Sequence, residues 1–152
     1  MTTIWTPRVT VAAIVEQHGK FLFVEERADD QLVINQPAGH WDQGESLVDA
    51  VVREMREETT LDFMPQGIVG LYDLDLPAKS ITYLRLCFFG LAQPSKQPLQ
   101  RDKDIVDVHW LTLADLNAKR QRWRSPLVGR CVNDYLGGAR YPLSLASERI
   151  VG

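Results

Sequence analysis

Hydrophobic and polar positions along the chain change period several times, and these changes predict its secondary structure. Two apolar runs, Val9–Gln17 and Lys20–Glu26, are separated by His18-Gly19, which predicts a hairpin of two strands. Later runs rich in β-branched and aromatic residues have the length of strands. They predict three further strands, Phe63–Leu74 with a turn near Gly67, Ile81–Ala92, and the shorter Val106–Leu111.

A helical period follows Ser46. This residue is a favourable N-cap, and Asp49, three residues later, supports a start that resembles a capping box. The helical pattern runs to about Thr59. Asn35–Gly44, which precedes it, contains one proline and two glycines and is predicted as an irregular loop.

A second helix is predicted near the C-terminal end. Ser125 is a suitable N-cap, Pro126 suits the first helical position, and Gly137-Gly138 ends the pattern. The chain contains no internal repeat or linker, so residues 1–152 are predicted as a single domain. Strands of hairpin and crossover type around two or more helices indicate an α/β or α+β layered fold with a mixed sheet.

The composition is that of a globular protein, with 45% hydrophobic and 24% charged residues among 152. The longest apolar stretches, Val9–Val15 and Leu84–Ala92, are too short to span a membrane. No secretory signal is recognised, so a cytoplasmic location is expected. Cys87 and Cys131 have no metal or redox spacing and are expected to be buried free thiols.

The helix after Ser46 carries an unusual arrangement of charge. At about 100° per residue, its apolar side chains share one face and Glu54, Glu57 and Glu58 share another. Like charges one helical turn apart repel each other. A hard divalent cation such as Mg²⁺ or Mn²⁺ removes this conflict, because it prefers oxygen ligands. The alternative is a solvated face on which Arg53 and Arg56 pair with the glutamates.

The whole segment GHWDQGESLVDAVVREMREETTL, which begins at Gly39, resembles the signature of the Nudix hydrolase superfamily. The glycine and polar positions of that pattern are matched by Gly39, Glu45, Arg53, Glu54, Glu57 and Glu58. Six fixed matches arise by chance in a chain of this length about once in 10⁵. Thr60 stands where the family has glycine, and a left-handed backbone there would cost roughly 1–2 kcal/mol.

Shorter segments extend the resemblance to the NudJ-type phosphatases within that superfamily. They are Asn35–His40, Tyr83–Arg85, Asp102–Ile105, Arg124–Val128 and Gly138–Leu143. The resemblance implies the Nudix fold, an α/β/α sandwich with a mixed β-sheet. It also implies hydrolysis of phosphoanhydride bonds in nucleoside di- and triphosphates and in hydroxymethylpyrimidine diphosphate.

The motif residues are assigned roles on this basis. Glu54, Glu57 and Glu58 are expected to hold Mg²⁺, with Mn²⁺ as an alternative, and the resemblance adds the backbone carbonyl of Gly39 as a ligand. Arg53 and Glu45 are expected to orient the ligands. The general base is expected to be Glu57, and the alternative is Asp102 or Asp104 in the polar loop Gln100–Asp104.

Substrate contacts are expected from the strand Ile81–Ala92 and from the loop before the helix. Arg85 lies on an otherwise apolar face, so it must contact a substrate phosphate or pair with a carboxylate. Tyr83 shares that face, and His40 follows the loop glycine. The expected ligand is a small phosphorylated metabolite.

A nucleic acid polymer is not the expected partner, because the formal net charge is −3. The basic segment from Lys119 to Arg130 is therefore expected to be a solvated surface. A membrane partner is not expected either, and a monomer is favoured because no helix has a spare apolar stripe. Two functions remain as alternatives. One is a pyrophosphatase for ADP-ribose or another nucleoside diphosphate derivative, because the position of Pro77, 16 residues beyond Leu61, resembles that in ADP-ribose hydrolases. The other is a sensor that binds a phosphorylated metabolite without hydrolysing it.

Overall fold

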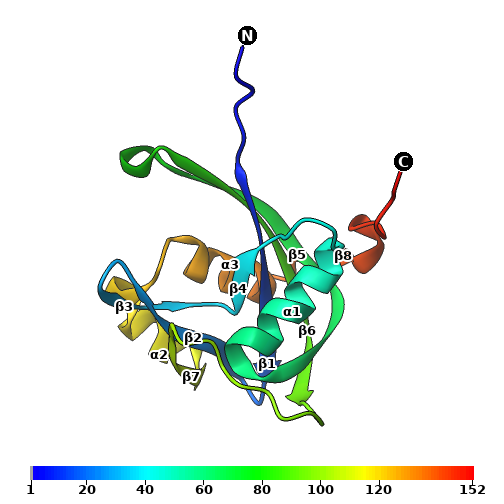
Figure 1. The fold of residues 1–152 in the computed structure, drawn as a ribbon. Coiled ribbons are helices and arrows are strands. Elements are labelled where there is room, and N and C mark those ends of the chain that lie inside the picture. The colour runs from blue at the N-terminus through cyan, green and yellow to red at the C-terminus, as the bar shows by residue number, and fades with distance from the viewer. Residues whose placement is uncertain (1) are drawn as a thin grey trace.

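The computed structural model describes residues 2–152, so Met1 of the predicted domain lies outside the described residues. A mixed sheet is flanked by helices (Figure 1). The strands are β1 (Arg8–Gln17), β2 (Lys20–Ala28), β3 (Gln31–Asn35), β4 (Ala38–His40), β5 (Leu61–Leu76), β6 (Ile81–Pro94), β7 (Ile105–Leu111) and β8 (Tyr141–Pro142). The helices are α1 (Leu47–Thr59), α2 (Leu113–Ala118) and α3 (Leu127–Leu136), with 3-10 turns at Pro77–Lys79, Arg120–Arg122 and Leu143–Leu145.

The strand order is β3-β2-β1-β6-β5-β8, with β4 also paired to β1 and β7 to β2. The β1–β6 pair is parallel, and the other named pairs are antiparallel. This confirms the predicted α+β layered fold with a mixed sheet. Among residues 2–152, no helix has the length and apolar character needed to cross a membrane.

Strand β1 lies at the centre of the sheet and is buried on both faces. Its Ala12 and Ile14 belong to a core shared with α2 and α3. The alternate residues Val11, Ala13 and Val15 belong to a second core, shared with α1. Because successive side chains point to opposite faces, a strand covered on both sides must be apolar at nearly every position. The continuous apolar run in the sequence is therefore explained by the burial of both faces of β1.

The structure corrects three details of the predicted pattern. Asn35–Gly44 is not wholly irregular, because Ala38–His40 forms β4 and pairs with β1. A strand of three residues has too few positions to reveal an alternating pattern. Helix α2 was not predicted, since it has only six residues. The turn predicted near Gly67 is wrong, because the long strand β5 continues through this position with two register shifts.

Both helix starts were predicted within one residue. The Ser46 Oγ atom accepts a hydrogen bond from the Asp49 amide at 3.0 Å, which confirms the N-cap of α1. In the last helix, the Ser125 Oγ atom accepts from the Leu127 amide at 3.2 Å. Helix α3 begins at Leu127, so Pro126 holds the N-cap position and not the first helical one. Cys87 and Cys131 are buried and free, as expected.

Helix α1 ends at Thr60 in a left-handed conformation. Its φ is 63°, and its amide donates to the Arg56 carbonyl. The family glycine at this position would adopt this backbone without steric cost, whereas threonine cannot. The Thr60 side chain makes no hydrogen bond within the described residues that would offset this strain.

Replacing Thr60 by glycine is expected to raise the free energy of unfolding by about 1 kcal/mol, the left-handed penalty less the added freedom of the unfolded chain. Urea unfolding followed by circular dichroism measures the change. Thr60→Ala is the control, because alanine keeps the Cβ atom and should give no comparable gain. Equal stability of the glycine variant and the parent would contradict the strain assigned to this cap.

Candidate active site on helix α1

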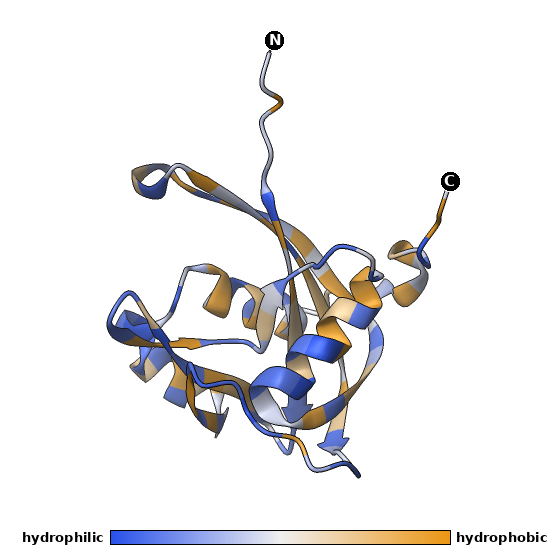
Figure 2. Ribbon diagram, viewed as in Figure 1, coloured by the Kyte–Doolittle hydropathy of each residue, from blue (hydrophilic) through white to orange (hydrophobic). Residues whose placement is uncertain are grey.

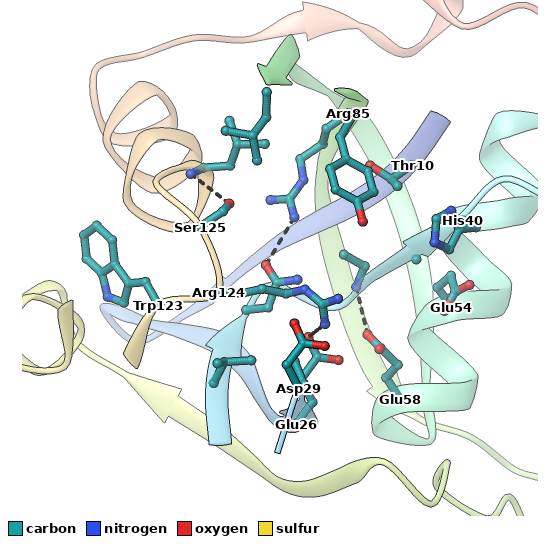
Figure 3. A pocket seen from close by; sticks show the side chains of 18 of the residues that line it. Thr10, Glu26, Asp29, His40, Glu54, Glu58, Arg85, Trp123, Arg124 and Ser125 are labelled. Atoms are coloured by element: carbon teal, nitrogen blue, oxygen red, sulfur yellow. Dashed lines mark hydrogen bonds and ion pairs between the residues drawn. The ribbon is translucent and has the colours of Figure 1, made fainter. Parts of the chain in front are cut away.

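A cavity of about 610 Å³ opens beside the C-terminal half of α1. This half of the helix is its hydrophilic half (Figure 2). The cavity walls come from α1, from β1, β3 and β4, from the β5–β6 hairpin and from the segment before α3. Figure 3 shows Glu54 and Glu58 on one side of the cavity, Arg85 above it, and Arg124 opposite the helix.

The three motif glutamates differ in exposure. Glu54 and Glu58 are buried, with 9% and 6% of their surface exposed, whereas the Glu57 side chain is 41% exposed. The Glu58 Oε1 atom accepts a hydrogen bond from the Ala38 amide at 2.8 Å. That contact joins α1 to β4. All three glutamates line the cavity, as their shared helical stripe predicted.

Gly39 lies in β4 directly against Glu54. A Cβ atom at position 39 would lie 2.1 Å from the Glu54 Cδ atom and 2.2 Å from Oε1. A side chain at position 39 would have to displace the Glu54 carboxylate, which accepts a hydrogen bond from Arg53. Glycine therefore allows the Glu54 carboxylate to lie directly against the β4 backbone.

Arg53 is the centre of the supporting network. Its Nε and Nη2 atoms donate to the two Glu45 carboxylate oxygens at 3.0 and 2.8 Å. Its Nη1 atom donates to Glu54 at 2.8 Å and to Glu57 at 3.2 Å, and Nη2 also donates to the His40 carbonyl at 2.9 Å. Hydrogen bonding and charge from Glu45 raise the Arg53 pKa, and Arg53 in turn lowers the Glu45 pKa. Arg53 thus ties the loop before α1 to two of the motif carboxylates.

This network leaves the Arg53 side chain only 27% exposed. It also bears on the solvated-face alternative. Arg56, the second arginine of that alternative, pairs with Asp62 and not with the motif glutamates. The Arg53 guanidinium therefore contacts four carboxylates, those of Asp42, Glu45, Glu54 and Glu57, so the cluster keeps an excess of negative charge.

Burial changes the acidity of the two enclosed glutamates. Desolvation raises the Glu58 pKa to about 9, against the lowering effect of the Ala38 amide. Desolvation also raises the Glu54 pKa to about 7, although Arg53 lowers it in part. The ordinary value for both is 4.5. Without a counter-ion, the folded protein therefore binds protons here that the unfolded chain releases at neutral pH.

The metal-free protein is accordingly expected to lose stability as pH rises from about 5 to about 9. In this range the unfolded state binds fewer protons at Glu58 than the folded state, so the free energy of unfolding falls, by up to about 1.4 kcal/mol per pH unit for one group. Urea unfolding in EDTA at pH 6, 7 and 8 measures the slope. Glu58→Gln, which mimics the protonated form, should flatten it. An unfolding free energy that rises over this range would contradict the assignment.

The donor set fits a hard divalent cation, although the carboxylates do not yet surround one. Among residues 2–152, no three His, Cys, Asp or Glu side chains are clustered as a preformed metal cage. The available donors are carboxylate oxygens, which Mg²⁺ prefers. Two of them belong to buried glutamates whose charge is incompletely balanced, and a cation would remove that cost. The Oε2 atoms of Glu54 and Glu58 accept no hydrogen bond within residues 2–152, so both could take part in holding an ion while Oε1 keeps its present bond.

Asp102 and Asp104 lie at different distances from the site. The Asp102 amide donates to the Glu57 carbonyl at 2.8 Å, and Asp102 lines the cavity. Asp104 is exposed and is not among the lining residues, and its carbonyl accepts from the Arg27 amide at 3.0 Å. The loop therefore brings Asp102 to the site and leaves Asp104 outside the cavity.

The predicted substrate residues all line the cavity. The rings of Tyr83 and His40 are neighbours, with centroids 6.3 Å apart. Arg85 is buried, and its Nη1 and Nη2 atoms donate to the amide oxygens of Gln36 at 3.0 Å and Asn35 at 3.2 Å. Arg85 forms no salt bridge with a carboxylate in the described part of the chain. The pairing with a motif glutamate, one of the two options for this residue, is therefore not observed.

Sequence reasoning missed Arg124 as a residue of the site. Its Nη1 atom donates to the buried Glu26 carboxylate at 2.7 Å, and both side chains line the cavity. The basic segment that contains Arg124 is partly neutralised within the fold, since Arg122 pairs with Glu25 and Arg130 with Asp134. Only the separation of about a hundred residues between Glu26 and Arg124 hid this contact from a local pattern.

Comparison with known proteins defines the class of this enzyme. The NUDIX domain family profile matches residues 5–130, so the chain belongs to the Nudix family and is a hydrolase of phosphoanhydride bonds. It is similar to phosphatase NudJ of Shigella boydii and of Escherichia coli K12, with 35% and 34% identity over 145 residues. These alignments cover 95% of this chain and 94% of each relative.

Solved structures of Nudix proteins have the same fold as this chain. A NUDIX hydrolase from Nitrosomonas europaea superposes with a TM-score of 0.89 at 39% identity, over 95% of this chain and 98% of that one. The NUDIX domain of NrtR from Shewanella oneidensis, solved with ADP ribose, has a TM-score of 0.68 at 19% identity, over 88% of this chain and 90% of that domain. The second similarity supports the fold alone.

Proposed function

We propose that the protein is a Mg²⁺-dependent phosphatase of nucleoside di- and triphosphates and of related diphosphates such as hydroxymethylpyrimidine diphosphate. The observation that carries this proposal is the pair of buried, incompletely balanced carboxylates, Glu54 and Glu58, at the wall of a cavity that also contains an uncompensated arginine, Arg85. Similarity to the NudJ phosphatases over nearly the whole chain supports the terminal-phosphate chemistry.

The metal would be held by Glu54, Glu57 and Glu58, with the Gly39 carbonyl as a further ligand. When bound, Mg²⁺ neutralises negative charge that develops on the phosphate oxygens. Arg53 positions Glu54 and Glu57 through its Nη1 atom, and Glu45 in turn fixes Arg53. Loss of either positioning residue would leave the ligands present but misaligned.

Glu57 is the proposed general base. It is the most exposed of the three glutamates, so a water molecule can reach its carboxylate from the cavity. Its Oε2 atom accepts a hydrogen bond from Arg53, which orients the carboxylate toward a proton donor in the cavity. Asp102 is the alternative base at the cavity wall, and Asp104 would require a movement of the loop to take that role.

Tyr83, His40 and Arg85 are proposed to contact the substrate. The phenol and imidazole rings form one side of the cavity, and Arg85 supplies positive charge away from the carboxylates. We further propose that residues 1–152 form a single domain that acts as a monomer on small phosphorylated metabolites. Neither a nucleic acid polymer nor a membrane is proposed as a partner.

A substrate panel tests the proposal. Nucleoside di- and triphosphates, hydroxymethylpyrimidine diphosphate and ADP-ribose are incubated with the enzyme, with Mg²⁺ or with EDTA, and all products are identified. Release of orthophosphate from the first three substrates, only with Mg²⁺, is the expected result. Preferential cleavage of ADP-ribose into two monophosphates would replace the proposal with a pyrophosphatase. Binding without hydrolysis across the panel would replace it with a sensor.

A further inference from the structure

Arg85 carries a buried positive charge that no acidic side chain among residues 2–152 balances through a salt bridge. It is 6% exposed, and its hydrogen-bonding partners are the neutral amide oxygens of Gln36 and Asn35, with the Cys131 sulfur at 4.0 Å. Its Nε atom is buried without any partner. A guanidinium has five N–H donors, so the described residues leave its donor capacity and its charge unsatisfied.

The two amides hold the arginine in place without neutralising its charge. Gln36 is fully buried and is itself fixed, because its Nε2 atom donates to the Val128 carbonyl of α3 at 2.7 Å. Asn35 ends β3 and lines the cavity. Burying a charge without a counter-ion is costly, whereas a carboxylate at position 35 would have removed the cost. The neutral amides therefore preserve a positive site for an external anion.

The sheet register places this charge relative to the carboxylate helix. Arg85 on β6 is paired with Thr10 on β1, and Thr10 is paired with His40 on β4, next to Gly39 and Glu54. Neighbouring strands lie about 4.8 Å apart, so the Arg85 backbone lies roughly 10 Å from β4. Figure 3 shows Arg85 on the far side of the cavity from Glu54 and Glu58.

The cavity continues beyond Arg85 along the β5–β6 ladder. Arg85 is paired with Tyr72, and the next pair on the same face is Tyr83 with Leu74, followed by Leu76 near the hairpin end. Leu74 and Leu76 line the cavity. Its lining thus runs from the α1 carboxylates past Arg85 to the two leucines, which lie next to the Lys79–Asp29 ion pair.

We propose that Arg85, held by Asn35 and Gln36, binds the phosphate attached to the organic group of the substrate. This proposal rests on the proposed function, in which the phosphate to be released lies at the α1 carboxylates. The order of the lining then directs the organic group to the leucines. Because the phosphate at Arg85 stays on the product, the site should bind a nucleoside monophosphate without any metal.

Asn35→Asp tests the proposal, since it supplies a carboxylate partner to Arg85 with almost no change of shape. Asn35 Oδ1 already accepts from Arg85, and Nδ2 donates no hydrogen bond within the described residues, so the fold should survive with an unchanged or higher melting temperature. The Kd for cytidine monophosphate in EDTA should rise at least about ten-fold, and the KM of a hydrolysed diphosphate should rise with little change in kcat.

Asn117→Asp is the matched control. It adds the same charge on an exposed position of α2, outside the cavity, and should leave the Kd and the KM within two-fold of the parent. Isothermal titration calorimetry of the three proteins with cytidine monophosphate gives the comparison. Equal affinity of the parent and Asn35→Asp, or no metal-free binding by the parent, would overturn the proposal. This binding needs no turnover. Metal-free binding can therefore fail while Mg²⁺-dependent hydrolysis succeeds, and hydrolysis can fail while metal-free binding succeeds.

Discussion

Replacing Glu57 by glutamine is expected to lower kcat by about 10³-fold, within the range that a general base contributes, while the protein stays folded. Glutamine keeps the volume of the side chain but can neither accept the proton from water nor contribute a charged ligand. The Glu57 side chain is 41% exposed, so little packing depends on it. Initial rates with the preferred substrate of the panel, at saturating Mg²⁺, measure the effect.

Glu148→Gln is the control for this experiment, because it makes the same change on an exposed residue of the C-terminal segment, away from the main cavity. Its kcat should equal that of the parent. Mg²⁺-dependent phosphate release at the parental rate by Glu57→Gln would refute the role of Glu57. In that case Asp102→Asn becomes the decisive variant, since Asp102 is the other acidic candidate at the cavity wall.

Replacing Gly39 by alanine is expected to reduce both activity and stability. The new Cβ atom would overlap the Glu54 carboxylate, at 2.1 Å from Cδ, so the carboxylate or β4 must move. Overpacking of this kind costs about 1–3 kcal/mol of unfolding free energy. A displaced ligand should lower kcat/KM by about 100-fold, as a misplacement of about 1 Å can.

A second substitution separates steric overlap from other effects of Gly39→Ala. In a Glu54→Ala background the overlap no longer exists, so Gly39→Ala should cost little further stability, and the double-mutant cycle should give a coupling of about 1–3 kcal/mol. Activity should stay low in both backgrounds because the ligand is absent. Additive losses of stability would show that Gly39 is required for a reason other than its contact with Glu54.

Much of the site was predictable because its residues lie close together in sequence. Glu54, Glu57 and Glu58 share a stripe through helical geometry alone, and the structure places all three at one cavity. Gly39 and Glu45 were matched through the same continuous motif. Their roles as ligand, base and supporting residue stay predictions, because a contact network does not identify chemistry.

The parts that could not be predicted depend on contacts between distant segments. Glu26 meets Arg124 across 98 positions, and Arg85 meets Gln36 across 49. The local pattern of hydrophobic and polar residues does not predict such pairs. Strand β4 escaped prediction for the same reason, since its existence depends on pairing with β1 and not on its own three residues.

The central claim is that the buried carboxylates of α1 hold a divalent cation at the cavity wall. Crystals soaked in Mn²⁺ test it most directly, because anomalous scattering locates the ion without assumption. The account predicts one or more ions within about 2.3 Å of oxygen atoms of Glu54 and Glu58. Occupied Mn²⁺ sites elsewhere, with no ion within coordination distance of any oxygen of Glu54 or Glu58, would contradict it.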